Sequence, residues 1–528
     1  MQSEKSQAIK ISLDLINQNK YNEAITKLND YLNINPKELE ILNLLALIYE
    51  KNNNLEESII IYKKILSIKK SFKIYDRLGE VYIKKDQYEQ SKKYFNKSLL
   101  INEKNPTTQN NLGMVLAYLD EEKKSITHFK KAISLDRNYR DPVYNLLEIY
   151  EKSNSIINFK KLIDSVLKIF KNDQIIKFYY SLLLKKNNEY KKAKQNLLEI
   201  NMNNNIWNIK KHYQLGVIND KLKNYSEAYQ YFENANIMSL KLIGKHRLTN
   251  NSFMKKLDEY LIQSKIKFKT PASINKKVNH FFLIGFPRSG TTLLDTILRR
   301  HKNIIVCEEK NMVSEMNKDL VSIKNLQNIS NKKLQNLADK YFSELSKVID
   351  IKKINKNIIV DKLPLNIVEA RIINLVFPNA KFIFSLRHPL DCVLSSYIQQ
   401  FKLNNAMINF LDLETTAEMY DKIMKIWKNY KEISTDNIHQ IKYEDLINNQ
   451  QSTLLKLMNF MGLKWDKKLL DSGAINKARG RIRTPSYDQV IQPIYKSSVY
   501  RWKNYTNELS KINLKIDKWC KYFDYKIN

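Results

Sequence analysis

The sequence has few cysteines, glycines and prolines, with 3 Cys, 9 Gly and 10 Pro among 528 residues. Cys307, Cys392 and Cys520 lie far apart and lack metal-ligand spacing. This pattern indicates neither a disulfide framework nor a zinc site, and it fits a reducing compartment. Because 43% of the residues are hydrophobic and glycine and proline are scarce, the composition excludes a fibrous or disordered chain. It indicates a packed, helix-rich protein.

Long apolar runs are also missing. No stretch approaches the ~18 consecutive apolar residues that a membrane-spanning helix needs. Residues 1–13 mix charged with apolar residues and lack the apolar core of a signal peptide. We therefore expect a cytoplasmic protein without a transmembrane segment.

Acidic residues are fewer than basic residues, and the formal net charge is +34. A positive field favours polyanionic ligands. However, lysine is frequent even in segments that carry no motif, so the excess charge says little about a specific partner. Neither a basic and aromatic face nor a known nucleic-acid-binding module stands out, and we expect no nucleic acid partner.

The first half of the chain repeats itself with a period of about 34 residues, the length of a helix-turn-helix unit. Large apolar residues alternate with small ones at fixed offsets, so that paired helices can approach closely. The clearest units contain Leu45, Ala46 and Tyr62; Leu78, Gly79 and Phe95; Leu112, Gly113 and Phe129; and Leu215, Gly216 and Phe232.

This pattern resembles tetratricopeptide repeats over residues 5–240. The units between about 141 and 205 fit it poorly, so we predict six or seven repeats. Stacked helix pairs of this kind form an α-solenoid with a concave groove. The resemblance implies that a polypeptide acceptor or a partner protein binds in that groove.

A second domain is expected over residues 279–528, after a linker at 241–278 where the repeat pattern stops. Residues 280–284 are predicted to form a buried strand. A glycine loop follows at 285–292, and then a helix at 293–300. This order predicts an α/β domain with a parallel sheet and a P-loop-like phosphate-binding loop.

The loop reads Gly285-Phe-Pro-Arg-Ser-Gly-Thr-Thr292. Backbone N–H groups in such a loop surround an anion at the amino end of a helix. Nucleotide triphosphatases have a lysine where this chain has Thr291, so hydrolysis of ATP or GTP, or a nucleotide kinase, is disfavoured. Arg288 supplies a different cation for a shorter anionic ligand.

Further landmarks follow the loop: Val360-Asp-Lys-Leu-Pro364, a predicted strand ending at Arg387, and Ser395 eight residues later. Together they resemble the nucleotide-dependent sulfotransferases, whose donor is 3′-phosphoadenosine 5′-phosphosulfate. The resemblance implies that Arg387 and Ser395 hold the 3′-phosphate. It implies that the loop holds the 5′-phosphosulfate through Arg288, Ser289, Gly290, Thr291 and Thr292.

The tyrosylprotein sulfotransferases are similar in two further motifs, the glutamate pair Glu308-Glu309 and the segment Ser486-Tyr-Asp-Gln-Val-Ile491. The similarity covers about residues 280–505. Two departures stand out: Gln399 lies where that branch has an arginine near the 3′-phosphate, and Arg501 replaces a lysine. The first change could weaken donor binding, whereas the second keeps the charge.

The resemblance assigns roles to single residues. Glu309 is the expected general base, although reasoning from the residues alone does not separate it from Glu308. Lys362 and Ser486 are expected to stabilise the transition state and the leaving group. Tyr443 and Arg501 are expected to contact the donor. The resemblance implies no metal.

We therefore predict a sulfotransferase that acts on a hydroxyl, with protein tyrosine as the acceptor. Two alternatives stay open. The acceptor could instead be a glycan, a lipid or a small phenol at the same donor site. The chain could also be a repeat scaffold whose second domain has lost catalysis and only binds partners, which Arg288, Glu309 and Lys362 argue against.

Overall fold

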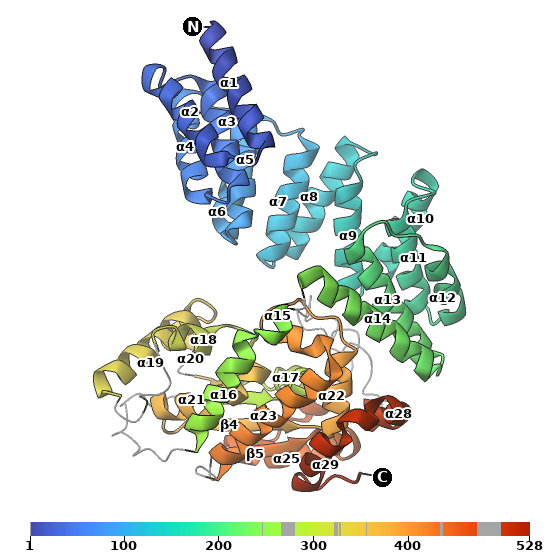
Figure 1. Cartoon of the computed structure of the whole chain (residues 1–528). Helices are drawn as coiled ribbons and strands as arrows, with labels where there is room; N and C mark the ends of the chain where they lie inside the picture. Colours follow the sequence, from blue (N-terminus) through green and yellow to red (C-terminus); the bar gives the residue numbers. More distant parts are fainter. Residues whose placement is uncertain are drawn as a thin grey trace. The chain divides into compact units, whose positions relative to one another are not determined.

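A computed structural model describes residues 2–244, 246–265, 280–320, 326, 329–354, 356–432, 437–471 and 498–527. The chain divides into two compact units, Met1–Tyr179 and Tyr180–Asn528. Figure 1 shows the elements of both units in sequence colours. None of the described helices is long and apolar enough to cross a membrane. Cys307, Cys392 and Cys520 are buried and form no disulfide.

The first unit consists of antiparallel helix pairs, as the 34-residue period predicts. Its helices are α1 (Gln2–Asn17), α2 (Tyr21–Ile34), α3 (Leu39–Lys51), α4 (Leu55–Ile68), α5 (Phe72–Lys84), α6 (Tyr88–Ile101), α7 (Pro106–Tyr118), α8 (Glu122–Leu135), α9 (Arg140–Lys152) and α10 (Ile156–Ile169). The unit boundary then falls within α11 (Gln174–Lys186).

Glycines let the two helices of a pair touch. A Cβ atom added to Gly79 would lie 2.6 Å from the ring of Phe95, and one added to Gly113 would lie 2.7 Å from the ring of Phe129. The pair is also joined by a buried hydrogen bond, because Ser91 Oγ donates to the Gly79 carbonyl at 2.8 Å. Large and small residues at these offsets therefore have the packing roles that the sequence predicts.

The turn inside each pair contains one residue with left-handed backbone geometry, a conformation that asparagine and aspartate tolerate best among residues with a Cβ. These residues are Asn19, Asn53, Asp86, Asp120, Asn154, Asn188 and Lys223, with φ between 52° and 64°. Their spacing stays near 34 residues through the stretch 141–205, where the apolar pattern is weak. The middle of the chain therefore continues the series of helix pairs.

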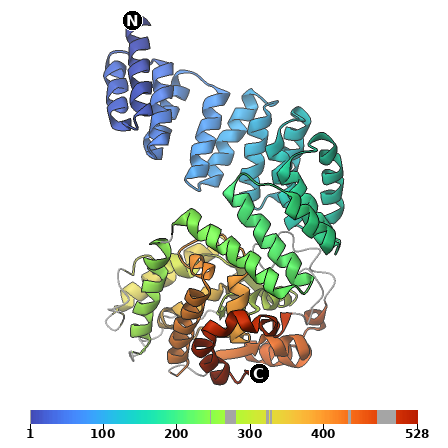
Figure 2. The same ribbon diagram turned by 45° about the vertical axis from the view of Figure 1, so that its right-hand side comes forward.

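The second unit begins with the remaining helices of that series, α12 (Tyr190–Glu199), α13 (Asn205–Lys221) and α14 (Tyr225–Ile243). The α13–α14 pair repeats the glycine contact, since a Cβ on Gly216 would lie 2.6 Å from the ring of Phe232. Residues of both helices belong to the same hydrophobic core as the sheet that follows. Figures 1 and 2 show α14 running along the sheet domain.

The range expected as a linker is partly helical. It contains α15 (His246–Thr249) and α16 (Ser252–Ser264), while residues 266–279 lie outside the described part. Helix α16 packs against α23 (Leu413–Lys431). Its side chains Leu257 and Tyr260 enter the core of the sheet domain, so this segment is integrated into that domain.

Five parallel strands form the sheet in the order β2-β3-β1-β4-β5. They are β1 (His280–Gly285), β2 (Ile304–Glu308), β3 (Ile358–Lys362), β4 (Lys381–Leu386) and β5 (Ile438–Lys442). Strand β1 lies at the centre, with Phe282 beside Asp361 of β3 and Phe382 of β4. The chain passes from β1 to the edge strand β2, returns to β3 between them, and then crosses to β4 and β5 on the other side of β1. Open sheets whose strand order changes direction in this way bind ligands at the carboxyl ends of the strands.

Helices cover both faces of the sheet, so its central strands are buried and mostly apolar. One face packs on α17 (Thr291–Leu298) and α25 (Gln450–Met461). The other packs on α19 (Asn331–Ser346), α21 (Ala370–Val376), α22 (Pro389–Tyr397), α23 and α29 (Asn513–Tyr522). The remaining elements are α18 (Met312–Asn317), α20 (Ile351–Ile354), η2 (Pro364–Glu369), η3 (Met407–Leu411), α24 (Tyr443–Asn448), η4 (Lys467–Leu470), η6 (Arg501–Tyr505), α28 (Thr506–Leu509) and η7 (Ser510–Ile512).

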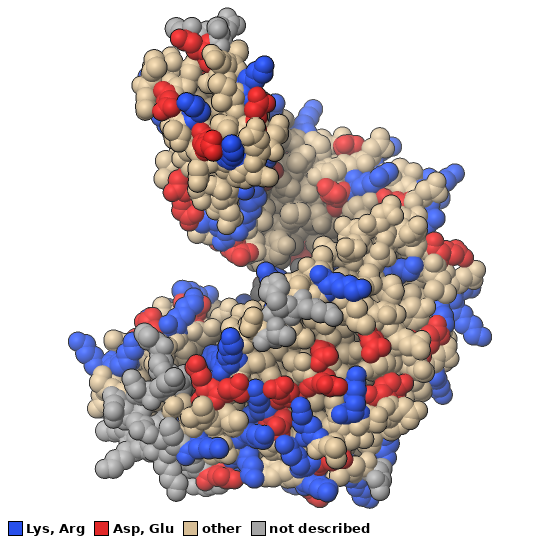
Figure 3. Space-filling model, in the orientation of Figure 1, with Lys and Arg blue, Asp and Glu red and all other residues tan. Residues whose placement is uncertain are grey.

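The predicted fold class, a helix-pair solenoid followed by an α/β domain with a parallel sheet and a phosphate-type loop, is confirmed. On the face drawn in Figure 3, Lys and Arg side chains are interspersed with Asp and Glu. On this face the basic side chains therefore do not gather in one field.

Candidate active site at the carboxyl edge of the sheet

The residues predicted to carry the chemistry meet at one edge of the sheet, because each follows the carboxyl end of a parallel strand. Gly285 ends β1, Glu308 ends β2 and Lys362 ends β3. Arg387 directly follows β4, and Tyr443 directly follows β5. All five strands thus contribute to one site, at the place where open α/β sheets bind ligands.

The glycines of the loop permit close packing that a side chain would prevent. A Cβ on Gly285 would lie 2.5 Å from both Ser289 Oγ and the Ser385 carbonyl. Gly290 has φ of +100° and faces the ring of Tyr443, which a Cβ would approach to 2.6 Å. The loop therefore needs glycine at both positions. Gly285 is needed for space, and Gly290 is needed for space and for its backbone geometry.

The loop residues point polar groups into a buried region at the start of α17. Arg288 adopts left-handed geometry with φ of 69°, a strained conformation that is typical of functional sites. Its Nε donates to Ser395 Oγ at 3.0 Å, so two predicted donor-binding residues meet. Thr291 and Thr292 are buried in the first turn of α17, where backbone N–H groups have no acceptor within the helix.

Lys362 lies in a ring of carboxylates. Its side chain is fully buried, and its Nζ lies 2.9 Å from Glu309 Oε1, 3.5 Å from Glu308 Oε1 and 4.0 Å from Asp295 Oδ2. Arg299 closes the ring, since its Nε lies 2.5 Å from Asp295 Oδ1. A buried ammonium needs such partners because its desolvation is costly.

The two adjacent glutamates differ in their surroundings. The Glu309 side chain is 32% exposed and the Glu308 side chain is 15% exposed. Glu308 also lies 3.8 Å from Arg299 Nη2. Glu309 has φ of 48°, and its backbone N–H donates to the Lys362 carbonyl at 2.8 Å. The backbone thus turns sharply at Glu309, whose carboxylate is the more exposed of the two.

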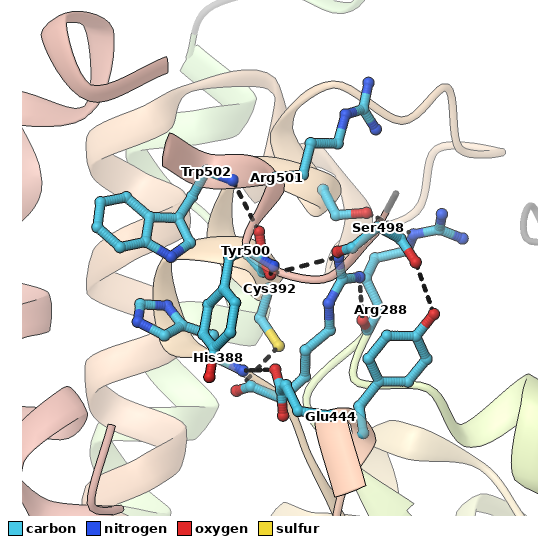
Figure 4. A network of polar contacts seen from close by, with 12 residues as sticks. Arg288, His388, Cys392, Glu444, Ser498, Tyr500, Arg501 and Trp502 are labelled. Atoms are coloured by element: carbon cyan, nitrogen blue, oxygen red, sulfur yellow. Dashed lines mark hydrogen bonds and ion pairs between the residues drawn. The ribbon is translucent and has the colours of Figure 1, made fainter. Parts of the chain in front are cut away.

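Arg387 is buried and oriented by several groups. Its Nη1 donates to the Arg288 carbonyl at 3.2 Å, and its Nη2 donates to the Ser498 carbonyl. Its guanidinium also lies 3.6 Å from Asp391 and above the ring of Tyr443, 5.0 Å from the ring centroid. The Tyr443 hydroxyl is 2.7 Å from Ser498 Oγ. Figure 4 shows Ser498 as part of this network.

Beside Arg387 lies a rigid layer of polar and aromatic contacts. Glu444 accepts the His388 N–H at 2.9 Å and the Tyr525 hydroxyl at 2.7 Å. The His388 ring stacks on Trp502 with 4.9 Å between centroids. Burial lowers the pKa of His388 to about 4. This imidazole is therefore neutral at physiological pH, and its Nε2 lies 3.2 Å from the Lys526 carbonyl.

Three residues singled out from the sequence are not among the contacts described so far. Ser486 lies outside the described residues, together with the rest of its segment up to Ile491. Gln399 lies just after α22, near the predicted donor residue Ser395. Arg501 does follow Tyr500 beside the Arg387 network, but its guanidinium forms an ion pair with Asp220 of α13 at 2.7 Å.

Sequence reasoning missed several residues that orient the predicted ones. Asp391 lies four residues after Arg387 on the start of a helix, and Asp295 lies four residues before Arg299. Both are ion pairs of the i,i+4 type that the sequence could have revealed. Asp220 is 281 residues away from Arg501, so no local pattern could have indicated that contact.

One buried carboxyl lies next to the site but faces away from it. Asp361 precedes Lys362 on β3, and its Oδ2 accepts the Tyr341 hydroxyl at 3.0 Å on the other face of the sheet. Within the described ranges its Oδ1 has no hydrogen-bond partner. Burial raises the pKa of Asp361 from 3.8 to about 7.

Asp361 should therefore make stability depend on pH. The folded state binds this proton more tightly than the unfolded state, so the free energy of unfolding falls as pH rises from 4 toward 8. Between pH 5 and pH 8, the free energy of unfolding of Asp361→Asn should rise by about 2–3 kcal/mol relative to that of the wild type. Denaturant unfolding at both pH values measures this difference. The exposed Asp350 offers the control Asp350→Asn, for which no such change is expected. If the free energy of unfolding changes with pH equally in Asp361→Asn and the wild type, Asp361 does not have the raised pKa.

Comparison with known proteins finds two family models that match separate parts of the chain. The model described as Sulfotransferase family matches residues 280–467, and the model described as Tetratricopeptide repeat matches residues 39–72, 72–105 and 106–139. Among curated relatives, an uncharacterized protein of Aquifex aeolicus is 26% identical over 313 residues, which cover 56% of this chain and 39% of the relative. A TPR repeat-containing protein of Methanocaldococcus jannaschii is 26% identical over 277 residues, which cover 46% of this chain and 48% of the relative. The chain spans less than half the length of these two relatives.

Two solved structures are distantly similar. A sulfotransferase domain from the curacin biosynthetic pathway is 19% identical with a TM-score of 0.34, and the match covers 48% of this chain and 100% of that domain. A tetratricopeptide repeat protein from Parabacteroides merdae is 15% identical with a TM-score of 0.38, and the match covers 45% of this chain and 93% of that protein. Neither likeness is strong enough to carry a functional conclusion. The two family models do establish the domain content: the chain carries a sulfotransferase family domain that follows tetratricopeptide repeats.

Proposed function

We propose that the protein transfers a sulfuryl group from 3′-phosphoadenosine 5′-phosphosulfate to an acceptor hydroxyl. The observation that carries this proposal is the meeting of Arg288, Lys362 and Arg387 with the carboxylate of Glu309 at one edge of the sheet. Three buried cations suit a ligand with separate anionic groups, and a carboxylate beside them suits proton removal.

The site has unsatisfied groups that fit an anionic donor. In the described part of the chain, neither Ser289 Oγ nor Arg387 Nε has a hydrogen-bond partner, although both are buried. Buried polar atoms are normally paired, so a ligand oxygen is a fitting partner for each. Ser289 belongs to the loop expected to hold the 5′-phosphosulfate, and Arg387 with Ser395 is expected to hold the 3′-phosphate.

The proposed chemistry is an in-line displacement. The acceptor oxygen forms a bond to sulfur while the bond from sulfur to the 5′-phosphate oxygen breaks, and the acceptor proton passes to Glu309. Adenosine 3′,5′-bisphosphate leaves. Lys362 is placed to stabilise negative charge that builds up at the transferred group, as cations do in phosphoryl transfer.

Glu309 is the better candidate for the base because its carboxylate is more exposed and can be reached by an acceptor. Glu308 is the less exposed of the two and lies beside Arg299. Ser486 remains a prediction for the leaving group, since it lies outside the described residues.

Protein tyrosine is the proposed acceptor. The support comes from the motifs shared with tyrosylprotein sulfotransferases, Glu308-Glu309 and the segment from Ser486, and from the repeats, which typically bind polypeptides. A glycan, lipid or small phenol would use the same donor site, and the acceptor assay closing the Discussion separates these classes. A cytoplasmic location is part of this proposal.

Binding of the product tests the donor site. Wild-type protein should bind adenosine 3′,5′-bisphosphate in calorimetry more tightly than ATP, because Thr291 replaces the lysine that holds triphosphates. Arg387→Ala should weaken bisphosphate binding by about 1.5–3 kcal/mol, which is typical of a charge-assisted contact. Arg300, a buried arginine beyond the far end of α17 that donates to the Leu469 carbonyl, offers the control Arg300→Ala, whose affinity should stay near that of the wild type. Tight binding of ATP without binding of the bisphosphate would contradict the proposal.

A further inference from the structure

A carboxylate from the repeat helices reaches the sulfotransferase domain. Asp220 lies in the last turn of α13, and its Oδ1 accepts hydrogen bonds from Arg501 Nε at 3.1 Å and from the Tyr505 hydroxyl at 2.6 Å. The Arg501 Nη2 atom is 2.7 Å from the same oxygen. The side chains of Asp220 and Arg501 are only 14% and 20% exposed, so solvent screens this pair much less than a surface pair.

Arg501 belongs to the segment that completes the Arg387 network. Ser498 accepts from Arg387, and the backbone N–H groups of Tyr500 and Trp502 donate to Asp391, each at 2.9 Å. Asp391 in turn pairs with Arg387. Residues 498–502 are thus fixed to the Arg387 side of the site through their main chain, with Arg501 in the middle.

The side chain of Arg501 is not fixed by those contacts. Figure 4 shows Trp502 and Arg501 pointing to opposite sides, the indole toward His388 and the guanidinium away from it. Burial and the charge of Arg387 act to lower the pKa of Arg501, whereas Asp220 acts to raise it. The effect of Asp220 prevails, so the pKa of Arg501 lies above its usual value. Each of the two arginines has its own carboxylate partner, Asp391 for Arg387 and Asp220 for Arg501.

We propose that Asp220 is a positioning residue for the donor site: the α13 carboxylate orients the guanidinium of Arg501, a predicted donor contact whose main chain is fixed to the Arg387 network. The proposal rests on the proposed function. The α13–α14 pair then contributes to nucleotide binding, because its residue Asp220 orients a residue of the donor site.

The helix pair is anchored to the same region by a second contact, which supports a fixed geometry. Asn236 of α14 donates to the carbonyl of Tyr397, the last residue of α22, at 3.0 Å. Tyr229 of α14 stacks on the Tyr397 ring with 5.6 Å between centroids. Since α22 also carries Ser395, α13 and α14 contact the elements that bear two predicted donor-binding residues.

The test compares bisphosphate affinity in a double-mutant cycle on the full chain. Asp220→Asn should raise the dissociation constant for adenosine 3′,5′-bisphosphate roughly 3- to 10-fold, because the Arg501 guanidinium loses its orientation. In an Arg501→Gln background the same change should alter it less than about 2-fold, because there is no guanidinium left to orient. In turnover assays the KM for the donor should rise and the KM for the acceptor should stay constant.

Two further variants guard against a merely structural effect. Asp220→Glu keeps the charge and should restore most of the affinity, which also covers the case in which Asp220→Asn folds poorly. Glu227 of α14 pairs with Lys194 of α12 at 2.8 Å, within the repeat layer, so Glu227→Gln should leave the dissociation constant unchanged. Thermal unfolding of every variant separates stability from affinity.

The outcomes separate this inference from the proposed function. If the wild type binds the bisphosphate and Asp220→Asn binds it equally well, the inference is wrong and the donor site stands. An equal loss in the wild-type and Arg501→Gln backgrounds also overturns it, because Asp220 would then act by another route. If the wild type binds no bisphosphate, the donor site itself is wrong and the inference falls with it.

Discussion

Glu309→Gln is expected to lower turnover by ~10²-fold or more while bisphosphate affinity stays nearly intact. The amide keeps the shape of the side chain and can still accept a hydrogen bond from Lys362. It cannot take up the acceptor proton, and the phenol of tyrosine, with a pKa of about 10, keeps its proton at neutral pH without a base. Initial rates of sulfuryl transfer to a tyrosine peptide, combined with calorimetry, measure both quantities.

The matched control is the neighbouring residue. Glu308→Gln should reduce turnover far less, because Glu308 is the less exposed carboxylate and lies beside Arg299. If Glu308→Gln abolishes turnover while Glu309→Gln does not, the base is Glu308. If both variants remain fully active, neither carboxylate is the base, and the acceptor arrives already deprotonated.

Lys362→Met is expected to lower turnover by roughly 10²- to 10³-fold, the usual loss when one group that stabilises transition-state charge is removed. The methionine fills most of the space but leaves Asp295, Glu308 and Glu309 without their shared cation. Their mutual repulsion should also lower the unfolding temperature. Rates must therefore be measured well below that temperature.

A lysine at the other end of the sheet offers the control. Lys381 begins β4, and its Nζ donates to the Phe460 carbonyl at 3.2 Å. Lys381→Met should change turnover by less than about 2-fold, because this lysine lies at the amino end of its strand, away from the reacting groups. Equal losses in Lys362→Met and Lys381→Met would mean that Lys362 contributes only to stability.

The parts of the site that the sequence predicts are those with local signals. The strand, the glycine loop and the helix after it follow each other directly, and the two glycines are required by contacts with Ser289 and Tyr443. Since the strands are parallel, residues that follow their carboxyl ends must meet at one edge. Arg288, Lys362, Arg387 and Tyr443 are brought together for this reason.

The remaining contacts depend on tertiary packing that no local pattern encodes. Asp220 and Arg501 meet only because α13 and α14 share a core with the sheet domain. Repeat helices normally bury their apolar faces against the next repeat. Here Tyr213, Tyr229 and Phe232 contribute to the core of the sulfotransferase domain instead, so a chain cut at residue 278 would expose that core.

The repeats show a similar division between local and distant signals. Leu78, Gly79 and Phe95 predict a helix pair because the large and small residues must interlock. Between 141 and 205 this interlock is weaker, yet Asn154 and Asn188 keep the left-handed turn at the same period. Asparagine and aspartate at a 34-residue spacing are therefore a sequence signal that predicts the helix pairs of this stretch as well.

The central claim is sulfuryl transfer, and one assay tests it most directly. Purified full-length protein is incubated with radiolabelled 3′-phosphoadenosine 5′-phosphosulfate and, in parallel, with tyrosine peptides, small phenols and glycans. We expect label on the tyrosine peptides, and we expect that label to be lost with Glu309→Gln. Label on a phenol or glycan alone would keep the enzyme class and change the acceptor. Absence of label on every acceptor, from protein that binds the bisphosphate, would contradict catalysis and leave a repeat scaffold that only binds the nucleotide.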